Sequence, residues 1–270
     1  MDENGSSSPA EIYERYLGPA IAEPFTRLLL KRAAPRRGQR VLDLACGTGV
    51  VARHVAPLVG VEGKVVAVDI SSAMLAVGRA LPAPVGTEIA WRQGDAIALD
   101  LPDGAFDLVL CQQGLQFFSD RLSALSEMRR VLARDGRVVL SVWRSLEHHP
   151  VYEALFRAVA RRFGLSLSAL DVSFSLGDAE ELRTLLVDAG FRRSEIEVCA
   201  LDVRVPAPAR FVQITVQGAT TSIPAFMKLR PAERSAIIET TSRELASLID
   251  RYSRDRMLEF QMSTHISTAS

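Results

Sequence analysis

Four nearly uninterrupted apolar runs, separated by segments of helical periodicity, constrain the fold of this chain more than any other feature. The runs are RVLDLAC (residues 40–46), KVVAVDI (64–70), FDLVLC (106–111) and RVVLSVW (137–143), and residues 87–92 predict a further strand. Strands of a parallel sheet are covered on both faces, so they read as continuous apolar runs instead of alternating ones. The sequence therefore predicts an α/β fold with a mostly parallel sheet.

Two later segments have a different pattern. Residues 194–205 and 257–269 alternate apolar and polar side chains, which is typical of antiparallel pairing. The predicted sheet then has seven strands, and the last of them is antiparallel. Among the helices, one is expected to begin at Ser71–Ser72 and to run to Ala80. Another is expected to begin at Ser119 and to end at Gly136 in a left-handed conformation.

The strongest signal for function is VLDLACGTGVVA, residues 41–52. A buried strand passes through Gly47 and Gly49 directly into a helix, and glycines at such a turn let a ligand approach the backbone closely. Asp69 ends the next strand, 20 residues beyond Gly49. A carboxylate there can accept hydrogen bonds from both ribose hydroxyls of a nucleoside. Asp43, the glycine turn and Asp69 together predict a nucleoside-binding site.

With these motifs the sequence resembles the class I S-adenosylmethionine-dependent methyltransferases, in particular the small-molecule branch with the (D/E)-x-G-x-G-x-G signature. The resemblance is close over residues 41–143 and looser toward the C-terminus. Asp43, Gly47 and Gly49 match the signature, and Ala45 stands at its first glycine. The resemblance implies a Rossmann-like fold and S-adenosyl-L-methionine as cofactor, with S-adenosyl-L-homocysteine as its product. The cofactor-binding residues that it implies are Asp43, Ala45, Gly47, Gly49, Asp69, Ile70, Met74, Gly94, Asp95, Ala96, Cys111 and Gln112.

Two rival classes share part of this pattern. Residues 47–52 also satisfy G-x-G-x-x-A, the fingerprint of nicotinamide-dependent oxidoreductases. Asp43 argues against them, because a carboxylate beside a pyrophosphate is repelled, whereas an ammonium and a sulfonium attract it. Methyltransferases that act on base amino groups commonly carry an Asn/Asp-Pro-Pro-aromatic run after the fourth strand. That position reads Cys111-Gln112-Gln113-Gly114 here.

Composition narrows the partners further. The chain carries 32 basic and 32 acidic residues, so it has no excess positive charge for binding many phosphates. Its three cysteines and four histidines form no metal-ligand pattern, and no apolar stretch approaches the length of a membrane helix. We therefore expect a cytoplasmic protein with a small-molecule substrate, no nucleic-acid or membrane partner and no metal.

Two insertions are expected to form a helical lid, because both leave the sheet at the edge where ligands of parallel sheets bind. One domain with insertions is preferred over two. The expected organisation is a disordered terminus (1–8), an N-terminal cap helix (9–36), a cofactor-binding core (37–147), a lid insertion (148–177), a core continuation (178–205), a second lid insertion (206–256) and the last core strand (257–270). The aromatic residues expected to line a substrate pocket under the lid, or to pack it, are Tyr13, Tyr16, Phe117, Phe118, Trp143, Tyr152, Phe156, Phe211 and Phe226.

A general base is sought among groups that titrate near neutral pH. His148 and His149 follow the fifth strand, and His149 directly precedes Pro150. His149 is the predicted base, with His148 and the N-terminal tyrosines Tyr13 and Tyr16 as alternatives. By the resemblance, an N-terminal tyrosine covers the cofactor.

Three functions stay open at this point. The first is methyl transfer from S-adenosylmethionine to an oxygen, nitrogen or carbon atom of a small, fairly apolar metabolite such as a phenol or a quinone precursor. The second is a non-methylating reaction on the same fold, such as cyclisation or decarboxylation, which uses the sulfonium charge. The third is a non-catalytic binding module.

Overall fold

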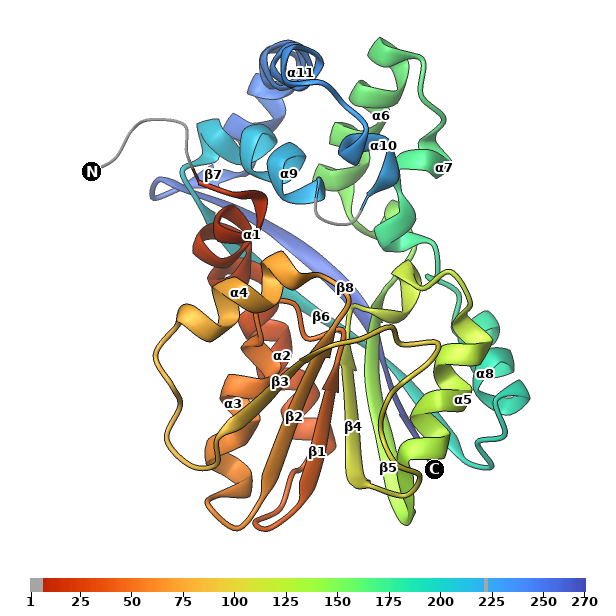
Figure 1. The fold of residues 1–270 in the computed structure, drawn as a ribbon. Coiled ribbons are helices and arrows are strands. Elements are labelled where there is room, and N and C mark those ends of the chain that lie inside the picture. The colour runs from red at the N-terminus through yellow and green to blue at the C-terminus, as the bar shows by residue number, and fades with distance from the viewer. Residues whose placement is uncertain (1–6, 221–222) are drawn as a thin grey trace.

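A single twisted sheet organises the part of the chain that the computed structural model describes, residues 7–220 and 223–270. Its strand order is β3-β2-β1-β4-β5-β8-β6, and the two-residue β7 pairs with β8 (Figure 1). Neighbouring strands from β3 to β5 pair in parallel, whereas β8 pairs antiparallel with both β5 and β6. The predicted mostly parallel sheet with an antiparallel last strand is confirmed. The strands are β1 (Arg40–Leu44), β2 (Lys64–Asp69), β3 (Ile89–Gln93), β4 (Phe106–Gln112), β5 (Leu132–Trp143), β6 (Ser194–Pro206), β7 (Ser253–Arg254) and β8 (Met257–Ala269).

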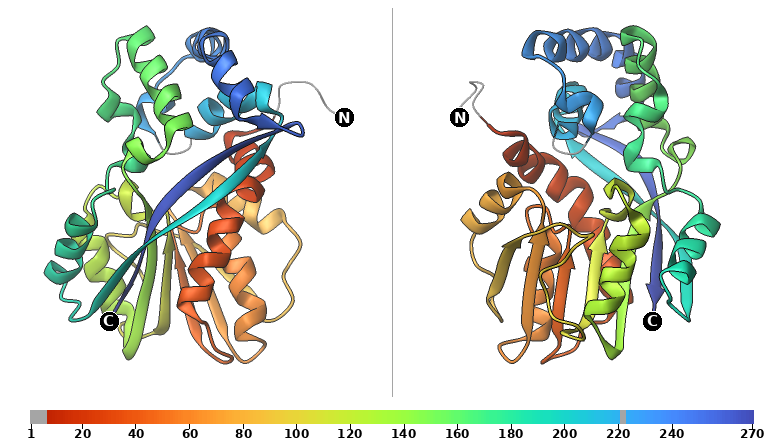
Figure 2. Two further views of the ribbon diagram at one scale, coloured as in Figure 1. Left: turned by 180° about the vertical axis from the view of Figure 1, so that it is seen from behind. Right: turned by 45° about the vertical axis from the view of Figure 1, so that its right-hand side comes forward.

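Helices cover both faces of this sheet, which explains the continuous apolar runs of its central strands. On β4, Leu108 and Leu110 pack toward the helices on one face, whereas Val109 and Cys111 pack toward those on the other. All four side chains are fully buried. The first face carries α2 (Glu23–Ala33), α3 (Val50–Val59) and α4 (Ser72–Ala80), and the second carries α5 (Arg121–Val131) and α8 (Ala179–Asp188) (Figure 2).

Both ends of α5 differ from the prediction. Asp120, not Ser119, caps the helix, because its side chain accepts a hydrogen bond from the backbone N–H of Ser123. The helix ends at Val131 instead of Gly136, and β5 begins at once because Leu132 pairs with Phe106 of β4. Gly136 lies within this strand. The predicted cap at Ser71 is confirmed, since its hydroxyl accepts from the N–H of Met74.

The N-terminal segment is helical from Pro9 to Ala33, but its centre is a wider helix than expected. It consists of α1 (Pro9–Ile12), the π-helix η1 (Tyr13–Ala22) and α2. Ser8 caps the start through a reciprocal pair of hydrogen bonds with Glu11. Residues 1–6 of the predicted disordered terminus lie outside the described residues.

Two helical insertions lie beyond the carboxyl ends of the parallel strands, at the top of Figure 1. They share one apolar core, in which Phe211 and Phe226 are fully buried. The insertion between β5 and α8 contains η3 (Leu146–His148), α6 (Pro150–Phe163), α7 (Leu167–Leu170) and η4 (Val172–Phe174). The insertion between β6 and β7 contains η5 (Pro208–Arg210), α9 (Phe211–Ala219), α10 (Pro224–Met227) and α11 (Pro231–Tyr252).

The two ends of the first insertion meet at Gly177. A Cβ atom at this position would lie 2.1 Å from the backbone nitrogen of Ser145 and 2.5 Å from its Cα. The carbonyl of Gly177 also faces Nε2 of His265 at 2.9 Å. The close backbone approach fixes where the insertion leaves and rejoins the sheet.

We predict that Gly177→Ala lowers the free energy of unfolding by about 1–3 kcal/mol, because the added methyl group overpacks a backbone contact that cannot yield. Gly18→Ala is the matched control, since a Cβ there makes only ordinary contacts, the nearest at 3.5 Å. Denaturant unfolding of both variants measures the effect. Equal stability of Gly177→Ala and wild type would contradict the close backbone contact between Gly177 and Ser145.

Candidate active site

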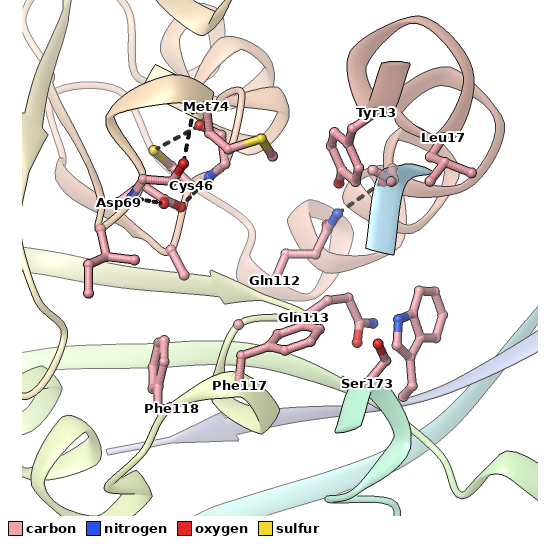
Figure 3. Close-up of a pocket in the computed structure, with 18 of the residues that line it drawn as sticks. Tyr13, Leu17, Cys46, Asp69, Met74, Gln112, Gln113, Phe117, Phe118 and Ser173 are labelled. Atoms are coloured by element: carbon pink, nitrogen blue, oxygen red, sulfur yellow. Dashed lines mark hydrogen bonds between the residues drawn. The ribbon is translucent and has the colours of Figure 1, made fainter. Parts of the chain in front are cut away.

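One cavity of about 570 Å³ lies between the carboxyl edge of the sheet and the helices above it (Figure 3). The strand ends of β1, β2, β4 and β5 all contribute lining residues, and so do η1, α6 and α9. In Figure 3, Tyr13 and Leu17 project from the N-terminal helix on one side of the cavity, opposite Asp69 and Met74 on the other. The cavity thus joins the predicted nucleoside site to the predicted lid.

Asp43 lies at the floor of this cavity, with only 1% of its surface exposed. Its Oδ2 accepts a hydrogen bond from the backbone N–H of Ala52 at 2.8 Å, whereas its Oδ1 has no partner among the described residues. Burial raises the pKa of this carboxyl to about 8. A buried oxygen without a partner is costly, so a donor or a cation supplied by a ligand would satisfy it.

The turn after β1 has the conformation that the glycine signature predicts. Ala45, Gly47 and Gly49 all have left-handed φ angles, of 55°, 56° and 82°. Glycine adopts this region freely, whereas alanine does so at a cost of roughly 1–2 kcal/mol. Ala45 therefore has the left-handed backbone conformation that the first glycine of the signature would adopt. At Gly49 the absence of a side chain is also steric, since a Cβ would lie 2.2 Å from the ring of Trp91.

Asp69 connects the end of β2 to the glycine turn. Its carboxylate accepts hydrogen bonds from the N–H groups of Gly47 at 2.7 Å and of Ser71 at 2.8 Å. Burial raises the pKa of Asp69, and these backbone bonds oppose the rise. Each carboxylate oxygen has a second lone pair, so Asp69 can still accept from ribose hydroxyls.

The walls around Asp69 suit a nucleoside base. Ile70 lines the cavity with 65% of its surface exposed, and Met74 lies nearby. Asp95 and Ala96 line the same region. An exposed apolar side chain beside a carboxylate offers a surface on which a flat base can stack. Together with the unpaired oxygen of Asp43, this arrangement fits a nucleoside that carries a cationic amino-acid group.

The structure brings most of the predicted cofactor-binding residues to this cavity. Those that line it are Asp43, Ala45, Gly47, Asp69, Ile70, Met74, Gly94, Asp95, Ala96 and Gln112. Gly49 and Cys111 do not line it. Gly49 instead receives the ring of Trp91, and the Cys111 side chain is fully buried in the core on the α5 face.

His149, the predicted general base, is fully buried and does not line the cavity. Its Nδ1 lies 3.2 Å from the carbonyl oxygen of Ser145, and its Nε2 lies 3.0 Å from the carbonyl oxygen and 3.1 Å from the backbone nitrogen of Ser263. Burial lowers the pKa of His149, so the ring is neutral at pH 7 and one of its two nitrogens carries the proton. The ring packs behind the cavity residues Trp143 and Phe174. The structure therefore does not support a role for His149 as the base. The His149 ring instead connects the lid to β8.

The alternatives His148 and Tyr16 also lie away from the cavity, whereas Tyr13 lines it. His148 is half-buried beside Glu147, and the Tyr16 hydroxyl accepts a hydrogen bond from Arg210 at 3.0 Å. These placements follow from the geometry of η1, which turns Tyr13 and Leu17 toward the cavity and Tyr16 toward η5. Burial raises the pKa of Tyr13 to about 12, so its phenol stays protonated at neutral pH.

Several lining residues carried no clear signal in the sequence. Gln113 follows Gln112 directly and has a left-handed φ of 54°, which only the structure shows. Ser173 and Thr215 lie on the two insertions within segments that read as ordinary helix or turn. Of the aromatic residues expected under the lid, those that line the cavity are Tyr13, Phe117, Phe118, Trp143, Tyr152 and Phe156. Phe211 and Phe226 pack the lid core.

Within residues 7–220 and 223–270, no helix combines the length and hydropathy needed to cross a bilayer. The same ranges hold no cluster of three or more histidine, cysteine, aspartate or glutamate side chains arranged to bind a metal ion.

We predict that His149 makes the stability of the protein depend on pH. Burial lowers its pKa from 6.5 to about 4, so the unfolded chain binds more protons than the folded chain between these values. The free energy of unfolding therefore falls by about 3 kcal/mol as the pH drops from 7 to 4 through this group alone. In denaturant titrations, the stability gap between wild type and His149→Gln is expected to be largest at pH 7 and to shrink toward pH 4. His148→Gln is the matched control, and a gap that does not change with pH would contradict the assignment.

Comparisons with known proteins agree with this geometry. Residues 41–136 match the family model described as a methyltransferase domain. The chain is 37% identical over 169 residues to the ubiquinone/menaquinone biosynthesis C-methyltransferase UbiE of Coxiella burnetii, covering 58% of this chain and 68% of the relative. It is 36% identical over 199 residues to the Escherichia coli enzyme of the same name, covering 68% of this chain and 79% of that relative.

Solved structures show the same fold at lower sequence identity. The YcgJ protein of Bacillus subtilis aligns with a TM-score of 0.58 and 21% identity, covering 90% of this chain and 96% of that chain. Phosphoethanolamine N-methyltransferase 2 of Haemonchus contortus, solved with S-adenosyl-L-methionine, aligns with a TM-score of 0.57 and 19% identity, covering 97% of this chain and 57% of that chain. The identity and coverage of the curated relatives, on a sheet and glycine turn of the expected form, show that the chain belongs to the class I S-adenosylmethionine-dependent methyltransferases and transfers a methyl group to a small molecule.

Proposed function

We propose that the methyl acceptor is a small, fairly apolar, ring-bearing metabolite of the phenol or quinone-precursor class, enclosed between the sheet edge and the two insertions. The observation that carries this proposal is the continuity of the cavity from Asp69 to the aromatic side chains of Trp143 and Tyr152. The curated relatives are named for C-methylation in quinone biosynthesis, which supports a carbon acceptor. The balanced charge of the chain supports a small molecule over a nucleic acid.

In this proposal the two ends of the cavity bind different molecules, the cofactor at the nucleoside end and the acceptor at the aromatic end. In this proposal Asp69 holds the ribose hydroxyls, Ile70 and Met74 hold the adenine, and Asp43 attracts the ammonium of the methionine part. When bound, S-adenosylmethionine supplies a methyl group on a positively charged sulfur, which is already activated for displacement. The protein therefore contributes mainly orientation and the exclusion of water.

Tyr13 is the residue best placed to cover the reacting region from the N-terminal helix. It lines the cavity, and burial raises the pKa of its phenol, with smaller contributions from the carboxylates of Glu14, Asp69 and Asp43. The helix that carries it is joined to the glycine turn, because Arg53 pairs with Glu14 at 2.9 Å and donates to the carbonyl oxygen of Thr48. We assign Tyr13 a covering and positioning role.

Incubation with S-adenosylmethionine and a panel of phenols, hydroquinones and naphthoquinols tests the proposal. We expect at least one ring-bearing acceptor to be methylated, with one S-adenosylhomocysteine formed for each product molecule. Tyr13→Ala is expected to lower kcat/KM by about 10- to 100-fold through lost positioning, whereas Tyr13→Phe retains most of the rate. Product formed without S-adenosylhomocysteine would instead indicate a non-methylating reaction. Methylation confined to charged, ring-free acceptors would contradict the proposal.

The buried Asp43 predicts how cofactor binding responds to pH. With a pKa of about 8, this carboxyl is mostly protonated at pH 7, but it must be ionised to pair with an ammonium. Binding of S-adenosylhomocysteine is therefore expected to release about one proton at pH 7, and affinity is expected to rise about tenfold from pH 6 to pH 7. Calorimetry in two buffers of different ionisation enthalpy measures both effects.

Asp43→Asn is expected to abolish the proton release and the pH dependence of affinity. Asp202→Asn is the matched control, because Asp202 is exposed on β6 and does not line the cavity. Unchanged proton release in Asp43→Asn would refute the assignment of the ammonium to this carboxylate.

A further inference from the structure

Two residues that carry a hydroxyl group line the lid part of the cavity, one from each insertion. Tyr152 lies on α6 and Thr215 lies on α9, and both line the cavity. Only 7% of Tyr152 and 5% of Thr215 are exposed.

The Thr215 hydroxyl is buried and forms no hydrogen bond of good geometry among the described residues, although it interacts with the Tyr152 phenol. Leaving a buried hydroxyl unpaired costs free energy that a protein recovers only if a ligand or a water supplies the partner. A valine would fill the same space without this cost. The position of Thr215 on a cavity wall therefore indicates a contact that forms when the cavity is filled.

Tyr152 lies in an aromatic cluster that leaves its phenol as the polar tip of an apolar wall. Its ring centroid lies between 5.6 and 6.0 Å from those of Phe156, Phe174, Phe211 and Phe260. Burial raises the pKa of Tyr152, and the nearby Thr215 hydroxyl opposes that rise. The phenol thus remains a hydrogen-bond donor at neutral pH.

The charges along the cavity limit what can occupy this part. Its lining contains no lysine, arginine or histidine among the described residues, and its carboxylates are Asp43, Asp69 and Asp95 at the nucleoside end. An anionic acceptor would lose its hydration without gaining a cationic side chain of the protein, which is unfavourable. An uncharged ring with one oxygen substituent meets both the aromatic wall and the two hydroxyls.

We propose that Thr215 and Tyr152 determine acceptor specificity by hydrogen bonding together to an uncharged hydroxyl or carbonyl oxygen on the ring of the acceptor, and that the cavity rejects acceptors bearing a carboxylate or phosphate. This inference rests on the proposed function, because it assigns the recognition of the acceptor in the same cavity. It explains why each insertion contributes one member of the pair.

Equilibrium dialysis with three matched probes tests the inference on protein saturated with S-adenosylhomocysteine. The probes are naphthalene, 2-naphthol and 2-naphthoate, which share a ring system and differ in one substituent. Wild type is expected to bind 2-naphthol about five- to tenfold more tightly than naphthalene, and 2-naphthoate more weakly than both. Thr215→Val and Tyr152→Phe are each expected to lose that preference for 2-naphthol while keeping their affinity for naphthalene.

Two further variants separate recognition from stability. Thr215→Ser keeps the hydroxyl and is expected to keep the preference for 2-naphthol. Thr241→Val is the matched control, because Thr241 is also a fully buried lid threonine without a hydrogen-bond partner among the described residues, but it does not line the cavity. It is expected to bind all three probes as wild type does.

Other outcomes overturn specific claims. Equal preference for 2-naphthol in Thr215→Val and wild type would overturn the recognition role. Binding of 2-naphthoate as tight as that of 2-naphthol would overturn the exclusion of anions, and absence of 2-naphthol binding to wild type would overturn the inference as a whole. The proposed function fails separately, if wild type does not bind S-adenosylhomocysteine or methylates no ring-bearing acceptor.

Discussion

The hydrogen bond from the Gly47 N–H to the Asp69 carboxylate holds the cofactor end of the molecule together. It joins the turn after β1 to the end of β2, two strands that are neighbours in the sheet. The same carboxylate accepts from Ser71 at the start of α4. One side chain therefore fixes a turn, a strand end and a helix start, and it does so at the place where we propose that the ribose binds. A backbone hydrogen bond from the Cys46 N–H to the carbonyl oxygen of Val68 adds a second link between this turn and β2.

The apolar character of the remaining cavity is consistent with the chemistry of methyl transfer. A sulfonium is already an activated electrophile, so a dry and shaped cavity contributes more than an additional charged group. The structure places no histidine on the cavity wall among the described residues. His149 instead connects the start of α6 to β8 through backbone contacts, and this arrangement holds the aromatic residues Trp143 and Phe174 in place.

Much of the fold and of the cofactor end could be predicted from the sequence, because both depend on local patterns. Continuous apolar runs predict the parallel strands, and the glycine turn with Asp43 and Asp69 predicts the nucleoside site. The end of α5 could not be predicted, since pairing of Leu132 with Phe106 is a long-range contact that overrides the cap signal of Gly136. The role of His149 could not be predicted from the sequence either, because its burial depends on Ser263, 114 residues further along the chain.

The placement of Tyr152 and Thr215 on separate insertions has a consequence for how such enzymes diversify. Neither α6 nor α9 belongs to the sheet or to the glycine turn. Substitutions on these helices can therefore alter which compound is accepted while the machinery for the methyl donor stays intact. Within this architecture, a lineage can acquire a new substrate through substitutions in the two insertions. The strands of the sheet need not change.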